Sequence, residues 1–177
     1  MNEQDLSPPP ALRRAGPGVL LRHGAHLVAL GFGSGLSPMA PGTAGTLWAW
    51  LAFLCINFVW APGDAQWGLI IATTFGLGWW ASTLTARHMG VADPGQIVID
   101  EVAAFWLVLW LVMPTGFWGQ LVAFALFRVF DAVKPGPVRW ADEAFHGTGW
   151  RGGFGILLDD FVAAFCTLLV IALWHAW

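Results

Sequence analysis

The sequence predicts an all-α fold, a compact integral-membrane bundle of about four to six helices. Composition is the first observation behind this prediction. Hydrophobic residues make up 57% of the 177 positions and charged residues 11%, whereas a soluble domain has about 25% charged residues. Mean hydropathy is +0.64, and the 13 Trp residues suit the membrane interface, where an apolar ring keeps its N–H hydrated.

Apolar stretches are the second observation, and each one marks an expected helix. Five are strong and a sixth is weaker and glycine-rich: residues 47–60, 67–86, 97–113, 117–130 and 154–174, then 27–36. Several are shorter than the roughly 20 residues that a spanning helix needs. The first and fourth either extend by a turn or lie re-entrant among the others, so the number of spans stays open.

The loops predict the domain boundaries and the orientation. Residues 1–24 are polar, contain Pro8–Pro10 and have no apolar segment followed by a cleavage site, so we expect a disordered tail before a membrane-embedded domain at residues 25–177. Basic residues outside the stretches fall on alternate loops: Arg13, Arg14, Arg22, Arg87, Lys134, Arg139 and Arg151. The positive-inside bias therefore places the N-terminus and the loop at residues 131–153 in the cytoplasm.

Two function classes are disfavoured at once. A net charge of −3 provides no basic stripe for nucleic acid. Cys55 and Cys166 lie within apolar stretches and form no CxxC pair, so redox chemistry is not expected.

Five carboxylates fall on three of the predicted helices at the same predicted depth, near the cytoplasmic face: Asp100, Glu101, Asp131, Asp159 and Asp160. Ionised carboxylates are costly beside hydrocarbon, and a bound divalent cation would offset that cost. Oxygen ligands without clustered Cys or His favour Mg²⁺, Mn²⁺ or Ca²⁺ over zinc. The alternative is that these acids form interfacial salt bridges with nearby Arg and Lys residues.

Two further segments point to a phosphate ligand. Arg128, Asp131 and Lys134 are spaced by three and share a helical face if the helix continues to Lys134. This pattern suits a phosphate ester beside a metal or, alternatively, solvent-facing ion pairs. The glycine-rich run at residues 31–46 opens onto a helix, where free N–H groups attract anions and Thr43 or Thr46 could cap the helix or donate a hydroxyl. An ordinary capped loop fits that run equally well.

Other phosphatase motifs are absent from the sequence. There is no Cys-x5-Arg, no Asp-x-Asp and no Gly-x-Ser-x-Gly elbow, and the five His residues match no histidine-dependent lipid phosphatase motif. Metal-assisted attack by water is the simplest remaining hydrolytic route.

Four segments together resemble the phosphatidylglycerophosphatase A family in order and spacing: GFGSGLSPMAPGTAGT (31–46), DPGQIVIDE (93–101), FRVFDAVKPGPVRW (127–140) and GFGILLDD (153–160). The resemblance implies a small, mainly helical protein of the bacterial inner membrane. Together with the apolar stretches and the basic loops, it predicts a multi-pass protein whose active site faces the cytoplasm. The resemblance also implies Mg²⁺-dependent removal of the terminal phosphate of phosphatidylglycerophosphate. The segment at residues 147–152 is longer than is usual in the family.

By position, the resemblance places the family's acidic residues and its Lys-Pro lysine on the acids that the charges had already singled out and on Lys134. The other roles below are expected from the residues themselves. The expected ligands of one or two Mg²⁺ ions are Asp100, Glu101, Asp131, Asp159 and Asp160; the expected catalytic residues are Glu101, Asp131 and Lys134; and the expected phosphate-binding residues are Gly42, Thr43, Thr46, Arg128, Lys134 and Arg139. The expected partners are the lipid substrate and membrane lipids. Direct attack by water and a covalent phospho-aspartyl intermediate both stay open, as does the oligomeric state.

Three other functions fit the sequence less well. A membrane cation transporter using intramembrane carboxylates would place its acids near the midplane rather than on one side. A non-catalytic scaffold leaves five carboxylates at one depth unexplained. A phosphotransferase of the CDP-alcohol type would carry a DG-x2-AR motif, which is absent.

Overall fold

The computed structural model describes residues 16–145 and 147–176 and is helical with no strand in that part of the chain. Its elements are α1 (Pro17–Leu20), α2 (Gly24–Ala29), η2 (Gly31–Leu36), α3 (Pro41–Val59), α4 (Asp64–Met89), α5 (Ile99–Val112), α6 (Phe117–Val133), α7 (Gly136–Ala144) and α8 (Gly149–Ala176). The all-α prediction is confirmed. Of the predicted tail, residues 1–15 lie outside the described residues, and residues 16–24 include α1.

The predicted number of helices was wrong. The described residues form nine helical segments rather than four to six. The additional ones are short: α1, α2, η2 and α7 have between 4 and 9 residues. Apolar stretches of membrane length cannot reveal such elements, because a short interfacial helix needs only a few buried side chains.

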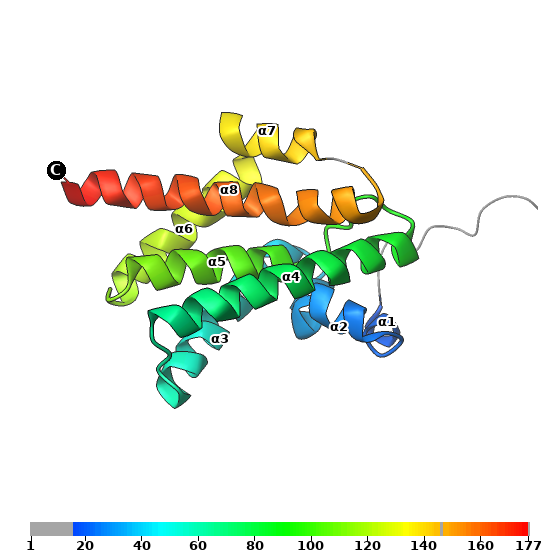
Figure 1. Ribbon diagram of the computed structural model, residues 1–177, viewed down its shortest axis with the longest axis horizontal. Coiled ribbons are helices and arrows are strands. Elements are labelled where there is room, and N and C mark those ends of the chain that lie inside the picture. The colour runs from blue at the N-terminus through cyan, green and yellow to red at the C-terminus, as the bar shows by residue number, and fades with distance from the viewer. Residues whose placement is uncertain (1–15, 146, 177) are drawn as a thin grey trace, which may run out of the picture.

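Helix α5 lies at the centre of the bundle and packs against α3, α4, α6 and α8. Ten of its 14 residues are buried. Figure 1 shows α4, α5 and α8 running lengthwise beside one another, with α6 crossing α8 and α7 lying along it. Helices α2 and η2 pack near the C-terminal end of α4 and the N-terminal end of α3, so the polar loops before α3 and α5 meet at one end of the bundle.

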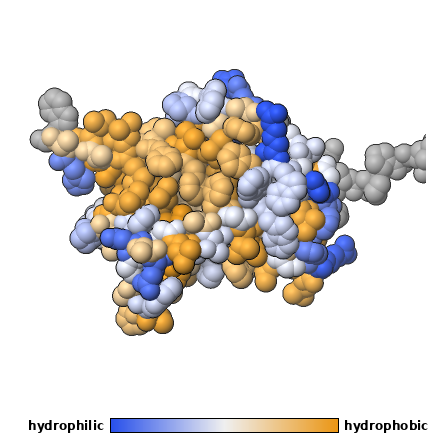
Figure 2. Space-filling model, viewed as in Figure 1, coloured by the Kyte–Doolittle hydropathy of each residue, from blue (hydrophilic) through white to orange (hydrophobic). Residues whose placement is uncertain are grey.

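Within the described residues, three helices are long and apolar enough to cross a membrane: α3, α4 and α8. Leucines on their outer faces are exposed, including Leu51, Leu69 and Leu169. Figure 2 shows a largely hydrophobic surface across the middle of the molecule, with hydrophilic residues toward its two ends. This banded surface is consistent with a membrane protein. Helices α5 and α6, with 14 and 17 residues, are shorter than the usual span.

Trp side chains link the helices through indole N–H groups. The Trp106 indole on α5 donates to the Ala49 carbonyl on α3 at 2.8 Å. The Trp50 indole on α3 donates to the Gln120 Oε1 on α6 at 2.6 Å. Each bond satisfies a polar group inside an apolar bundle, where an unpaired one would be costly. Tryptophan therefore has a packing role here as well as the interfacial role expected from the sequence.

Glycine on α8 allows α4 to approach closely. A Cβ at Gly153 would collide with the Thr83 hydroxyl oxygen and lie 2.9 Å from the Thr83 Cβ. Because Thr83 is itself buried, we expect Gly153→Ala to destabilise the protein by about 1–3 kcal/mol through overpacking. Thermal unfolding in detergent micelles would measure this loss.

Gly76 provides the matched control for that substitution. It lies within α4, and a Cβ there would meet nothing within 4 Å. Gly76→Ala should therefore leave the melting temperature unchanged or raise it, since alanine favours helix by about 1 kcal/mol over glycine. Equal effects of the two substitutions would contradict the close α4–α8 contact.

Candidate active site

The five predicted carboxylates come from three helices. Asp100 and Glu101 lie in the first turn of α5, Asp131 in the last turn of α6, and Asp159 and Asp160 in the N-terminal half of α8. Asp160 interacts electrostatically with all of the other four. The structure thus brings together the five acids that the sequence singled out.

The centre of this group fits a metal ion. Asp100, Glu101 and Asp160 each offer a carboxylate oxygen within 4.8 Å of the others, and all three residues are buried. Four buried carboxylate oxygens in the group accept no hydrogen bond in the described structure: Asp100 Oδ1, Glu101 Oε2, Asp159 Oδ1 and Asp160 Oδ2. Orphaned oxygens of this kind cost free energy unless a cation compensates them. A donor set made only of carboxylates suits a hard cation such as Mg²⁺.

Arg128 connects this acidic group to α3. Its Nη1 lies 2.6 Å from Asp131 Oδ2 and 3.7 Å from Glu101 Oε1. The same nitrogen donates to the Thr46 hydroxyl at 3.3 Å. Its buried Nε–H donates to no described residue, so the guanidinium keeps one donor for a ligand. A planar guanidinium with a spare donor is suited to a phosphate oxygen.

The start of α3 lies directly against this arginine and glutamate. Gly42 is in the first turn of α3, and a Cβ there would collide with Glu101 Oε1 and lie 3.0 Å from Arg128 Nη2. Thr46 is fully buried and donates to the Gly42 carbonyl at 2.8 Å. Neither Thr43 nor Thr46 caps the helix, because the N-cap is Ala40 and makes no side-chain cap bond. Thr46 instead orients Arg128.

Lys134 is the second cation of the site. Its Nζ lies 2.6 Å from Asp159 Oδ2 and 2.8 Å from Asp142 Oδ1, which joins the end of α6 to α7 and α8. Its backbone is left-handed, with φ 47°, a conformation that costs a non-glycine residue free energy and that the two ion pairs offset. Burial opposes the charge, but the bonds to Asp142 and Asp159 outweigh it and raise the pKa of Lys134 above its usual range.

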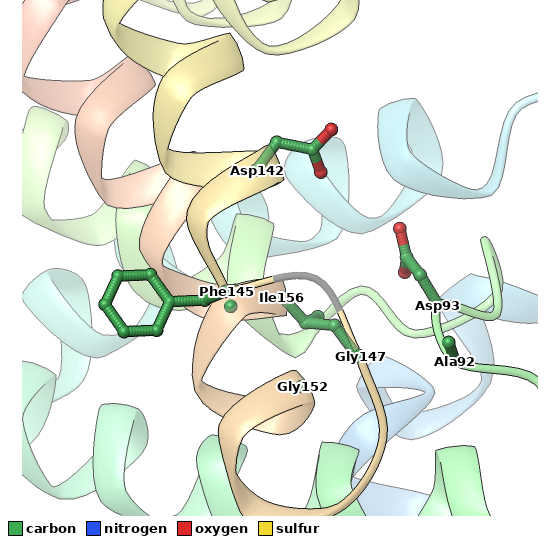
Figure 3. A pocket seen from close by; sticks show the side chains of 8 residues that line it. Ala92, Asp93, Asp142, Phe145, Gly147, Gly152 and Ile156 are labelled. Carbon is green, nitrogen blue, oxygen red and sulfur yellow. The ribbon is translucent and has the colours of Figure 1, made fainter.

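A small pocket borders this ion-pair network. It encloses about 10 Å³, enough for about one water molecule, and is lined by Asp93, Asp142 and Phe145 among others. Figure 3 shows the Asp93 carboxylate, from the loop before α5, and the Asp142 carboxylate, from α7, lying on one side of it while the Phe145 ring points away. Asp142 was not among the predicted site residues. The sequence feature that points to it is a further acidic residue, Asp142, that follows Lys134 and Pro135 within one short helix.

One predicted phosphate-binding residue lies apart from the rest. Arg139 is on α7 and pairs with Glu143 at 2.8 Å, and its side chain is 72% exposed. The structure does not bring it to the carboxylate group. Thr43 lies half-buried in the first turn of α3, beside Gly42.

The close approach at Gly42 leads to a testable expectation. We expect Gly42→Ala to displace Glu101 or Arg128, because an added Cβ would meet both side chains, and to lower the activity of the site by roughly tenfold or more. Gly95→Ala is the control, since a Cβ there meets nothing within 4 Å. Activity measured together with the melting temperature separates a displaced site from a lost fold. Activity equal to that of the control variant would argue against this contact being functional.

The fold and the site define a membrane-type helical protein with a buried carboxylate centre flanked by arginine and lysine. The family model of phosphatidylglycerophosphatase A matches residues 27–175, and the chain belongs to this family, whose members are phosphoric monoester hydrolases. No solved structure matches the chain.

Three named relatives are similar over most of their length. Phosphatidylglycerophosphatase A of Escherichia coli is 41% identical over 139 residues, which cover 78% of this chain and 76% of the relative. The protein of that name from Haemophilus influenzae is 38% identical, covering 86% and 89%. A putative phosphatidylinositol-3-phosphatase of Bacteroides thetaiotaomicron is 37% identical, covering 82% and 90%. The cation-transporter alternative finds no support in these similarities.

Proposed function

We propose that this protein is an Mg²⁺-dependent lipid phosphatase that hydrolyses phosphatidylglycerophosphate to phosphatidylglycerol and phosphate. The observation that carries the proposal is the buried carboxylate group with four uncompensated oxygens beside Arg128 and Lys134. Such a site combines ligands for a hard cation with cations for a phosphate, which is what a metal-assisted phosphomonoesterase requires. The names of two relatives supply the substrate.

In this proposal, carboxylates bind the metal ion, and cations and the start of α3 bind the phosphate. Asp100, Glu101 and Asp160, supported by Asp131 and Asp159, would hold Mg²⁺, which when bound polarises the phosphate ester and lowers the pKa of a bound water. Arg128 and Lys134 neutralise the phosphate oxygens. The backbone at Gly42 and the Thr43 hydroxyl provide further donors at the start of α3.

The hydrolysis needs a nucleophile, a base and a leaving group. The P–O bond to glycerol breaks, water supplies the incoming oxygen, and the departing glycerol oxygen takes a proton. Glu101 is our candidate general base, because one of its oxygens faces Arg128 while the other is buried without a partner. An aspartate nucleophile that forms a transient acyl phosphate is the alternative route.

We propose that the site faces the cytoplasm from a bacterial inner membrane. The start of α3, the start of α5 and the end of α6 all contribute to the site, so it lies at one end of the bundle. Arg22 precedes α2, Arg87 lies in the last turn of α4 and Lys134 follows α6. The positive-inside bias favours the side that carries these residues for the cytoplasm. A phosphate group at this boundary is reached while the acyl chains stay in the bilayer.

The decisive experiment measures phosphate release by the detergent-purified protein with and without Mg²⁺. Phosphatidylglycerophosphate is compared with phosphatidic acid, with a soluble phosphomonoester and with phosphatidylinositol 3-phosphate, the substrate class named for the Bacteroides relative. Mg²⁺-dependent release from the first lipid alone supports the proposal. A preference for the inositol lipid would change the proposed substrate. Absence of phosphate release with every metal tested would reject the proposed function.

A further inference from the structure

An open apolar groove lies at the end of the bundle away from the carboxylates. Its volume is about 860 Å³, within the range of ligand sites in proteins. Its walls are α6 and the C-terminal part of α8, with the end of α5 at its base: Val122, Leu126, Leu168, Ile171 and Leu111 are among its lining residues. Its lining holds no Asp, Glu, Lys or Arg, so it suits a hydrocarbon ligand rather than a charged or peptide one.

The groove and the proposed active site are built on the same two helices. At one end, the ion pair between Lys134 and Asp159 closes the space between α6 and α8. Toward the other end, residues of the same two helices line the groove. Leu126 precedes Asp131 by five residues, which is about 7.5 Å along the axis of α6.

The groove also has the length of a lipid chain segment. From Leu126 to Trp118 it follows α6 for eight residues, about 12 Å, whereas one leaflet of hydrocarbon is about 15 Å deep. If the phosphate of a lipid lies at the carboxylates, its glycerol lies along the part of α6 between Asp131 and Leu126. One of its acyl chains then reaches the groove.

We propose that the groove between α6 and α8 binds an acyl chain of the phospholipid whose phosphate lies at the carboxylate group. This inference rests on the proposed function, because it is that function which makes the ligand a lipid. Burial of the chain provides affinity that does not depend on the headgroup. The enzyme therefore discriminates substrates by chain length as well as by headgroup.

The test compares two phosphatidylglycerophosphates, dipalmitoyl and dihexanoyl, in the same mixed micelles with Mg²⁺. Val122→Trp fills the groove, and Leu169→Trp is the control, because Leu169 is similarly exposed, at 60% against 54%, but lies outside the groove lining. We expect Val122→Trp to lower kcat/KM about tenfold for the long-chain lipid and to leave the short-chain rate unchanged. Leu169→Trp should leave both rates unchanged.

A photoreactive lipid gives a second readout that does not depend on catalysis. Phosphatidylglycerol with a diazirine near the end of one acyl chain should label peptides of α6 and α8 in the wild-type protein, and less so in Val122→Trp. Labelling confined to other helices would overturn the inference, even if Val122→Trp lowers both rates by misfolding.

The remaining outcomes separate the two proposals. Wild-type release from both lipids with no chain-length effect of Val122→Trp overturns the groove assignment and leaves the proposed function standing. A change of oligomeric state in Val122→Trp would make the groove a contact between copies and also overturn it. Absence of phosphate release by the wild-type protein counts against the proposed function, and the photolabel then decides whether the groove binds lipid.

Discussion

Asp160→Asn should abolish the metal-dependent activity, lowering kcat/KM by at least about 100-fold. The carboxylate is buried against Asp100 and Glu101 and carries an oxygen that no described group satisfies. Amide substitution keeps the shape but removes the negative charge that a divalent cation needs. Asp131→Asn should have the same direction of effect with membrane insertion unchanged, and phosphate release by the purified variants measures both.

The melting temperature distinguishes a metal ligand from a structural acid. Ligand binding stabilises the folded state by mass action, so Mg²⁺ should raise the melting temperature of the wild-type protein and not that of Asp160→Asn. Without Mg²⁺ the variant should melt at a higher temperature than the wild type, because one of several mutually repelling carboxylates is gone.

Glu143→Gln is the matched control for the removal of a carboxylate. Glu143 pairs with Arg139 on α7, and its side chain is 64% exposed. We expect this variant to keep its activity and its Mg²⁺-dependent melting shift. Equal loss in Glu143→Gln and Asp160→Asn would mean that general surface charge, and not a metal centre, supports the activity.

Much of the fold could be predicted because the transfer of apolar side chains from water to the membrane determines which segments form long helices. A long apolar stretch has few alternatives to a membrane-buried helix, and α4 and α8 contain the stretches predicted at residues 67–86 and 154–174. Their polar extensions were not predicted. Helix α8 begins at Gly149 because the approach to Gly153 packs as helix against α4, and that contact cannot be read from hydropathy.

The acidic part of the site was predictable for a related reason. Carboxylates are costly beside hydrocarbon, so the few present had to share a compensating environment. The contacts that Arg128 and Lys134 make outside the group of five carboxylates could not be predicted in this way. Spacing predicted Arg128 and Lys134 on one helical face, but α6 ends at Val133 and Lys134 follows it in a left-handed conformation. The contacts with Thr46 and Asp142 depend on how α3 and α7 pack. Arg139 shared the sequence segment but faces away, because α7 is a separate helix after Pro135.

Arg128→Gln is expected to lower kcat by about 100- to 1000-fold, the range seen when one preorganised donor to a developing charge is removed. Arg128 holds Glu101, Asp131 and Thr46 in contact at once and keeps its Nε–H free of described partners. Arg128→Lys should restore little of the activity, because an ammonium cannot reproduce the planar fork. Kinetics with saturating Mg²⁺ would show whether the loss falls on kcat.

A stability measurement must accompany this substitution. Removing one partner of a buried ion pair costs about 3–5 kcal/mol. The Arg128–Asp131 pair is partly exposed, so Arg128→Gln should melt at a lower temperature with a smaller loss of stability than that. The double variant Arg128→Gln with Asp131→Asn removes both charges and should recover stability without recovering activity. Arg139→Gln makes the same charge change at an exposed pair and should be silent in both measurements. Activity that returned with stability in the double variant would make Arg128 a packing residue, since a phosphate-binding cation cannot be replaced by a neutral pair.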